Sequence, residues 1–167
     1  MNSNTDDNQK TKVLFVCLGN ICRSPAAEGI FRAIVAERGN ETDWVIDSAG
    51  IGNWHTGQLP DQRMRVHARR RGYDLVHHAR QVCVLDFDRF DYIIGMDSSN
   101  IEDLRSLAPS PEAMKKIKPM SHWLRNVATR YDHIPDPYYE GAEGFELVLD
   151  LLQDACSNLY SDLTSGT

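Results

Sequence analysis

Cys17 and Arg23 are the residues whose types and spacing could most directly do chemistry. The loop that contains them reads Cys17-Leu18-Gly19-Asn20-Ile21-Cys22-Arg23-Ser24. It follows an apolar run, residues 13–16, and leads into a segment that opens like a helix at Pro25. Backbone N–H groups of a tight loop and of a helix N-terminus converge on an anion. The same field stabilises a thiolate, so the pattern predicts a nucleophilic Cys17 facing a bound phosphate group.

Each of these residue types suits that chemistry. A thiolate on Cys17 can attack phosphorus and form a phosphocysteine. The planar guanidinium of Arg23 offers N–H donors that match two phosphate oxygens, and it does not lose its charge. Gly19 and Asn20 tolerate the left-handed backbone that turns successive N–H groups inward. The cysteine–arginine spacing alone also arises by chance, and the flanking strand and helix make it specific.

A second candidate lies far along the chain, in Ile134-Pro-Asp-Pro-Tyr-Tyr139. Expelling a phenolate or alkoxide near neutral pH requires a proton, and hydrolysis of the intermediate requires a base that activates water. The carboxyl group of Asp136 can do both, and Pro135 and Pro137 restrict the backbone around it. On its residues alone the segment fits an ordinary Asp-Pro turn better than a catalytic acid.

Hydrophobic periodicity predicts the elements that position these residues. Strands are expected over 12–16, 44–46, 91–96 and 116–119. Helices are expected from Pro25 to just before Gly39, over 61–71 with Gly72 closing it, over 98–107, and along 145–159. Ser24 is the expected N-cap of the first helix, and Ser98 or Ser99 that of the third.

Strands that alternate with helices predict an α/β fold, a parallel sheet with helices on both faces. In such sheets ligands bind beyond the carboxyl ends of the strands. The Cys17 loop and a loop carrying Ser48 both follow predicted strands. The predicted topology and the predicted site therefore agree.

Composition narrows the class of protein. The chain has 167 residues, 41% hydrophobic and 25% charged, which fits a single soluble globular domain. A net charge of −6 argues against a nucleic-acid partner, and no apolar run is long enough for a transmembrane helix. Residues 1–12 lack the basic and apolar regions of a signal peptide. We expect a disordered tail over 1–11, a domain over 12–163 and a cytoplasmic location.

The four cysteines, Cys17, Cys22, Cys83 and Cys156, have the spacing of neither a disulfide framework nor a zinc site. We therefore expect a reduced protein without a metal.

Residues 13–25, Val-Leu-Phe-Val-Cys-Leu-Gly-Asn-Ile-Cys-Arg-Ser-Pro, resemble the signature of the low-molecular-weight protein tyrosine phosphatases. Three further segments match in order: Asp47-Ser-Ala-Gly50, Tyr92-Ile-Ile-Gly-Met-Asp97 and Asp136-Pro-Tyr-Tyr139. The resemblance spans about residues 12–160. It implies a single domain with a four-stranded parallel sheet of the flavodoxin-like, phosphotyrosine phosphatase I-like type, and hydrolysis of phosphotyrosine and aryl phosphate monoesters without a cofactor.

The resemblance also implies roles around residues 17–24, which we call the phosphate loop and to which Leu18 and Ile21 contribute backbone. Asp136 is implied as general acid and then general base. The Ser24 hydroxyl would bond the sulfur of Cys17 and ease its departure, while Asn20 and Ser48 would hold the loop in shape. Cys22 would form a reversible disulfide with Cys17 that prevents over-oxidation.

Three aromatic residues, Trp54, Tyr138 and Tyr139, resemble the walls of the family's cleft, which favour phosphotyrosine over the shorter phosphoserine. His77 and Asp97 match a histidine–carboxylate pair that supports the site. The implied partners are phosphotyrosine-containing proteins, with phosphate and vanadate as inhibitors. We expect neither nucleic acid nor membrane as a partner, and a monomer.

Two other functions remain open at this stage. A thioredoxin-coupled arsenate reductase shares this loop but needs a downstream cysteine pair, and Cys83 has Phe90 at the nearest candidate position. A non-catalytic phosphate-binding module would have lost Cys17, Arg23 or Asp136. The basic residues of 63–71 suit a solvated helix face, or alternatively a surface that attracts acidic phosphopeptides.

Overall fold

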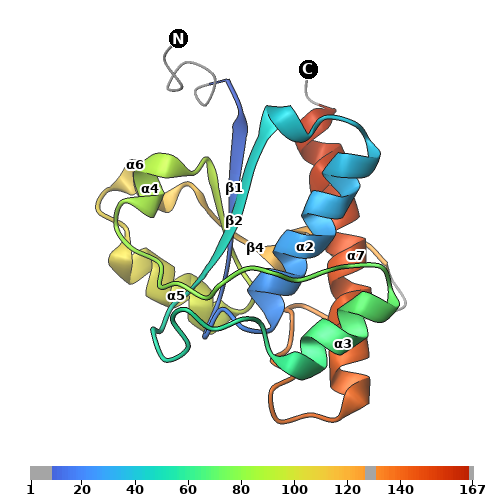
Figure 1. Cartoon of the computed structure of the whole chain (residues 1–167). Helices are drawn as coiled ribbons and strands as arrows, with labels where there is room; N and C mark the ends of the chain where they lie inside the picture. The colour runs from blue at the N-terminus through green and yellow to red at the C-terminus, as the bar shows by residue number, and fades with distance from the viewer. Residues whose placement is uncertain (1–8, 127–130, 166–167) are drawn as a thin grey trace.

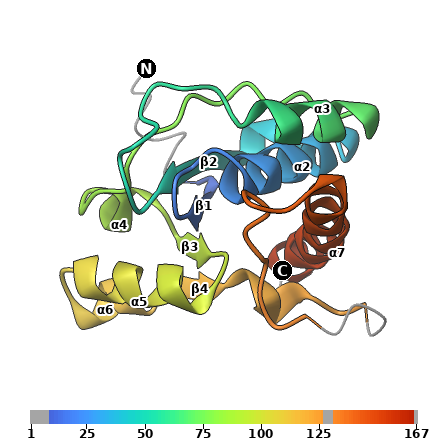
Figure 2. The ribbon, with the colours of Figure 1, turned by 90° about the horizontal axis from the view of Figure 1, so that it is seen from below.

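A parallel four-stranded sheet with strand order β2-β1-β3-β4 forms the centre of the molecule. A computed structural model describes residues 9–126 and 131–165, drawn in Figures 1 and 2. The strands are β1 (Thr11–Cys17), β2 (Trp44–Gly50), β3 (Tyr92–Gly95) and β4 (Ile117–Pro119). Most of the expected N-terminal tail lies outside the described residues. The predicted α/β architecture is confirmed.

Helices connect and cover the strands. The α-helices are α2 (Arg23–Glu37), α3 (Gln62–Arg70), α4 (Asp86–Arg89), α5 (Ser98–Leu107), α6 (Pro111–Met114) and α7 (Ala142–Thr164). Short 3-10 helices are η1 (Glu41–Asp43) and η2 (Met120–Trp123). Among the described residues, none of these helices combines the length and apolar character needed to cross a membrane.

Both faces of the sheet are buried, as the alternation along β1 demonstrates. Val13 and Phe15 belong to the core formed with α2, α3 and α7, whereas Leu14 and Val16 belong to the core formed with α4 and α5. All four side chains are fully buried. Figure 2 shows α2 and α7 on one side of the sheet and α5 and α6 on the other. A continuous apolar run is what a central parallel strand requires, because both of its faces leave water.

The last helix, α7, packs along α2 through the apolar stripe that the sequence predicts. Phe145, Val148, Leu149 and Leu152 are all buried. The helix starts three residues before Phe145 and continues beyond 159, because its ends carry polar residues that periodicity does not detect.

The carboxyl ends of three strands meet at one edge of the sheet. Cys17 at the end of β1 pairs with Gly50 at the end of β2, and Val16 pairs with Gly95 at the end of β3. The loops that leave these ends therefore converge, which is the usual place for a ligand in this architecture.

The structure corrects three local predictions. Cys22, not Ser24, is the N-cap of α2, and Ser24 lies inside the helix. The cap of α5 is Asp97, whose carboxylate accepts from Asn100 N at 2.9 Å, so neither Ser98 nor Ser99 caps it. Ser48 lies within β2 rather than in a loop, because the strand runs four residues beyond the apolar segment that predicted it. Asp61 and Gly72, by contrast, bound α3 as expected.

Candidate active site

The loop between β1 and α2 curls around a single point beyond the end of the sheet. Cys17 closes β1 with 3% of its surface exposed, and α2 begins at Arg23. Asn20 adopts a left-handed backbone with φ of 58°. The left-handed backbone expected at Gly19 is not observed, since its φ is not positive. The lack of a side chain at Gly19 instead leaves room for the ring of His55. The short turn and the helix N-terminus supply the positive field that an anion needs.

Ser24 and Cys17 are in contact at the base of this loop. The hydroxyl oxygen of Ser24 lies 3.0 Å from the sulfur of Cys17. Asn20 Nδ2 donates to Ser24 Oγ at 2.8 Å and to Ser48 Oγ at 3.0 Å. All four side chains are buried, so these bonds hold the loop without competition from water.

The other end of the Asn20 amide completes this network. Its Oδ1 accepts from Arg80 N and from His77 Nε2, both at 3.0 Å. Because Nδ2 already donates to the two serines, Oδ1 must be the acceptor and His77 Nε2 the donor. Ser48 in turn donates to Glu28 Oε1 at 2.7 Å. Both polar atoms of the Asn20 side chain therefore have partners, which hold this residue in its left-handed backbone conformation.

The expected pairing of His77 with Asp97 is wrong. His77 Nδ1 lies 3.2 Å from Glu28 Oε1 and 3.5 Å from Asp47 Oδ1. Asp97 instead binds Arg23 on the other side of the loop. A match of sequence segments identified both residues as supports but could not tell which partner each had.

Glu28, Asp47 and His77 bring one potential metal-ligand atom each to within 4.8 Å of one another. Arg32 already pairs with Glu28 at 2.9 Å, and Arg80 pairs with Asp47 at 3.0 Å. Two guanidinium groups beside the carboxylates favour a network of ion pairs over a bound cation.

The Arg23 side chain is 2% exposed, and its guanidinium is held by two acceptors. Its Nη1 donates to Asp97 Oδ2 at 2.7 Å and to the carbonyl oxygen of Ile134 at 2.9 Å. Burial acts to lower the pKa of Arg23, but the negative charges of Cys17, Asp97 and Asp136 outweigh it and raise the pKa. The guanidinium stays charged, and with Nη1 occupied, Nε and Nη2 are the donors left for a ligand.

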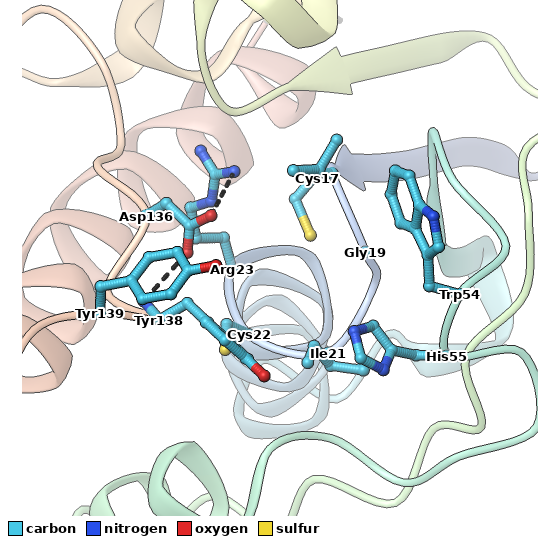
Figure 3. A pocket seen from close by; sticks show the side chains of 11 residues that line it. Cys17, Gly19, Ile21, Cys22, Arg23, Trp54, His55, Asp136, Tyr138 and Tyr139 are labelled. Atoms are coloured by element: carbon cyan, nitrogen blue, oxygen red, sulfur yellow. Dashed lines mark hydrogen bonds and ion pairs between the residues drawn. The ribbon is translucent and has the colours of Figure 1, made fainter.

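Asp136 approaches the site from the segment before α7. Its Oδ2 lies 3.7 Å from Arg23 Nη2, and its Oδ1 accepts from Tyr138 N at 3.0 Å (Figure 3). The side chain is 41% exposed, so one edge is open to the pocket and to water. The structure thus brings together Cys17, Arg23 and Asp136, although 113 positions separate Arg23 from Asp136.

These residues line a pocket of about 210 Å³. Trp54 and His55 form one wall, and Tyr138 and Tyr139 lie on the opposite side with Asp136 (Figure 3). Cys17 lies on the floor. Trp54 is 65% exposed and Tyr139 93%, so both aromatic faces are available to a ligand. His55 was not predicted, although its position next to Trp54 in the same loop is a signal that could have revealed it.

Cys22, the second thiol of the loop, is buried, and both it and Cys17 are free. Burial raises the pKa of Cys22, and the nearby Asp61 and Cys17 raise it further. Cys22 is therefore a neutral thiol at physiological pH.

Gly50 is a second residue whose role the sequence did not reveal. A Cβ built on Gly50 would lie 2.9 Å from the carbonyl carbon of Gly19 and 3.0 Å from Asn20 N. Real Cβ atoms do not approach backbone so closely, so only glycine lets the end of β2 pack against the phosphate loop.

The site combines a buried thiol, a guanidinium fixed by a carboxylate and a half-exposed carboxyl group opposite, next to the N-terminus of α2. A cysteine-dependent phosphatase requires these parts. The fold places them where parallel α/β sheets bind ligands.

Comparison with known proteins agrees with this class. Residues 12–166 match the family model described as low molecular weight phosphotyrosine protein phosphatase. The chain is 44% identical over 152 residues to a putative low molecular weight protein-tyrosine-phosphatase of Synechocystis, covering 91% of this chain and 96% of that one. It is 45% identical over 156 residues to the phosphatase YfkJ of Bacillus subtilis, covering 90% and 94%.

A solved structure leads to the same family. The crystal structure of a protein tyrosine phosphatase from Entamoeba histolytica, with Hepes in its active site, superposes with a TM-score of 0.90 at 41% identity. The match covers 94% of this chain and 99% of that one. The chain belongs to the low molecular weight phosphotyrosine protein phosphatase family. It is a hydrolase that dephosphorylates phosphotyrosine, as the sequence resemblance implied.

Proposed function

We propose that this phosphatase acts through a phosphocysteine on Cys17, with Asp136 as general acid and then general base. In the first step the thiolate sulfur attacks phosphorus and an S–P bond forms. The bond from phosphorus to the aryl oxygen breaks, and that oxygen takes the proton of Asp136 and leaves as the phenol. Arg23 and the loop amides bind the equatorial oxygens, where charge spreads in the transition state.

In the second step the same residues hydrolyse the intermediate. The Asp136 carboxylate removes a proton from a water molecule, whose oxygen attacks phosphorus. The S–P bond breaks, phosphate is released, and Cys17 returns to the thiolate. The Ser24 hydroxyl donates to the departing sulfur and lowers the energy of its negative charge.

The observation that carries the proposal is the 3.7 Å approach of Asp136 to Arg23. It puts the only carboxyl group among the described pocket-lining residues beside the guanidinium that would hold the phosphate. A leaving-group oxygen pointing away from Cys17 would then meet a proton donor. No metal or cofactor is needed in this scheme.

The aromatic walls support phosphotyrosine-containing proteins as substrates. Trp54 on one side and Tyr138 on the other can sandwich a flat phenyl ring above the recessed sulfur. A short phosphoserine would not span this depth. In this proposal inorganic phosphate and vanadate compete for the same loop, the enzyme is a cytoplasmic monomer, and neither nucleic acid nor a membrane is its partner.

Variants of Cys17 and Asp136 test the mechanism. With p-nitrophenyl phosphate and EDTA present, Cys17→Ser should abolish activity, whereas Cys83→Ser, which changes an exposed thiol, should leave it unchanged. Rapid quenching of the wild type should trap phosphate on Cys17. Full activity in Cys17→Ser would refute the covalent route.

Asp136→Asn should lower kcat/KM mainly for substrates with poor leaving groups, by roughly 10²–10⁴-fold for the most basic phenolates. An equal loss across all leaving groups would show that Asp136 is not the acid. An assay of arsenate reduction with thioredoxin separates the reductase alternative, for which we expect no turnover.

A further inference from the structure

Arg63, in the first turn of α3, lies over two aromatic rings near the mouth of the active-site pocket. The central carbon of its guanidinium is 5.4 Å from the ring centre of Tyr138 and 4.8 Å from that of Phe145. Tyr138 lines the pocket, whereas Phe145 is buried at the start of α7. A guanidinium stacked on aromatic faces is attracted by their electron density, and Arg does this better than Lys.

The same guanidinium is anchored to the phosphate loop through Asp61. Arg63 Nε and Nη2 donate to the two carboxylate oxygens of Asp61 at 3.1 and 2.9 Å. Asp61 also accepts from Arg63 N at 2.8 Å, and its own backbone N–H donates to the carbonyl oxygen of Ile21 at 2.7 Å. The Asp61 side chain is only 11% exposed. A two-pronged bond of this kind fixes the guanidinium plane as well as its position.

Tyr138 connects Arg63 to Asp136. The backbone N–H of Tyr138 donates to Asp136 Oδ1 at 3.0 Å, so the place of Tyr138 determines which way the carboxyl group points. The other end of this segment is fixed separately, because Ile134 N donates to Met96 O and Ile134 O accepts from Arg23. Contacts therefore run continuously from Ile21 through Asp61, Arg63 and Tyr138 to Asp136.

We propose that Arg63 is a positioning residue that clamps the Asp136 segment against the phosphate loop. It touches neither phosphate nor leaving group, and it acts by holding Tyr138 and thereby the carboxyl group that delivers the proton. The inference rests on the proposed role of Asp136. It assigns a task to one member of the basic stretch of α3 that the sequence left between a solvated face and a surface for acidic peptides.

Attraction of acidic peptides is the competing role for Arg63, and its contacts argue against it. Its charge is already matched by the Asp61 carboxylate at two bonds, which leaves little net field at the pocket mouth. Other arginines of α3 differ: Arg69 lies 3.7 Å from Asp74, with 67% and 75% of the two side chains exposed. Such an exposed ion pair does not fix the position of either side chain. Arg69 therefore offers a matched control with the same charge on the same helix.

The experiment compares Arg63→Ala, Arg63→Lys and Arg69→Ala, using kcat/KM for two substrates. Phenyl phosphate has a strongly basic leaving group, and p-nitrophenyl phosphate has a weakly basic one. For Arg63→Ala we expect a loss of roughly tenfold on phenyl phosphate and under about twofold on p-nitrophenyl phosphate, a part of what a well-placed acid contributes. Arg63→Lys should show most of this loss, because lysine lacks the planar fork. Arg69→Ala should match the wild type.

Combining Arg63→Ala with Asp136→Asn provides a separate check. If Arg63 acts through Asp136, the double variant should be no slower than Asp136→Asn alone, since residues in one network are not additive. Thermal unfolding of each variant verifies that the fold is intact.

The results separate failure of the inference from failure of the proposed mechanism. If Asp136→Asn steepens the leaving-group dependence and Arg63→Ala does not, Arg63 does not position the acid. An Arg63→Lys variant that equals the wild type at low salt, and loses that activity as salt rises, would assign Arg63 to charge attraction instead. If Asp136→Asn itself causes no steepening, the acid assignment fails, and the inference fails with it.

Discussion

The sulfur of Cys17 lies 3.0 Å from the hydroxyl oxygen of Ser24, and the neighbours of Ser24 limit where its hydrogen can point. Ser24 Oγ accepts from Asn20 Nδ2, so its own hydrogen must point elsewhere. The other acceptor within reach is the carbonyl oxygen of Ala49, at the longer distance of 3.3 Å. The sulfur of Cys17 is thus the nearer of the two acceptors open to that hydrogen, and the buried Asn20 amide fixes the Ser24 hydroxyl beside it.

Replacing Ser24 by alanine should slow the second chemical step more than the first. A hydrogen bond to a charged group contributes about 1.5–3 kcal/mol, which corresponds to a loss of roughly 10- to 150-fold in the step that uses it. We expect kcat to fall while kcat/KM changes little, so phosphoenzyme should accumulate in a stopped-flow burst. A loss confined to kcat/KM would mean that Ser24 serves phosphorylation instead. Ser98→Ala, at the exposed start of α5, is a control that should leave both constants unchanged.

The Arg23–Asp97 ion pair predicts a large loss of kcat when Arg23 is replaced and a smaller loss when Asp97 is replaced. Arg23→Lys should lower kcat by roughly 10²–10³-fold, because a point charge cannot replace a fixed pair of donors to the transition state. Asp97→Asn keeps Arg23 but weakens the bond that orients it, so we expect a smaller loss in steady-state assays. Equal kcat values for Asp97→Asn and the wild type would show that Ile134 O alone orients the guanidinium.

Gly50 should not tolerate a methyl group. In Gly50→Ala the new Cβ would displace the backbone of Gly19 and Asn20, and the amides would no longer converge on phosphate. We expect vanadate inhibition to weaken more than tenfold, in a titration monitored by activity, while the far-UV spectrum stays native. Gly141→Ala is the control, since a Cβ there meets nothing within 4 Å. Equal vanadate affinities in the two variants would contradict this account of Gly50.

Peroxide should inactivate the enzyme reversibly. Oxidation of Cys17 to a sulfenic acid, followed by condensation with the Cys22 thiol, forms a disulfide and releases water. Dithiothreitol should then restore activity. In Cys22→Ser the same treatment should cause permanent loss, because the sulfenic acid is oxidised further. Mass spectrometry of the peptide over 12–31 measures both products, and recovery of Cys22→Ser to the wild-type level would refute the protective role.

The lowered pKa of Glu146 predicts how the free energy of unfolding changes at acid pH. Its bonds from His67 and Arg71 hold the pKa of Glu146 below its ordinary value. Between the folded and unfolded pKa values the unfolded chain binds more protons, so this contribution is present above the unfolded pKa and disappears as pH falls through the folded one. Urea midpoints measured from pH 6 downwards should fall less steeply in Glu146→Gln, which starts lower. Parallel curves would contradict the linkage. Because Glu146 is partly exposed, we expect a modest effect.

Local sequence features predicted those parts of the site that one loop contains. Cys17, Asn20 and Arg23 belong to a single turn between strand and helix, so their relative places depend on few backbone angles. The resemblance favoured the acid over an ordinary Asp-Pro turn at Asp136, and it added the roles of Ser48 and Trp54, which lie in separate segments. It could not provide the partners, and for that reason His77 was matched with Asp97 when each binds elsewhere.

The sequence by itself determined the alternation of strands and helices and the strand–loop–helix that carries Cys17, because hydrophobic periodicity and local turn chemistry depend on consecutive residues. Only the tertiary structure decided that Asp97 holds Arg23, that Gly50 presses on the phosphate loop and that Arg63 lies against Tyr138. Those contacts join residues 30 to 75 positions apart. They depend on strand order, register and helix packing, which arise from burying both faces of the sheet at once.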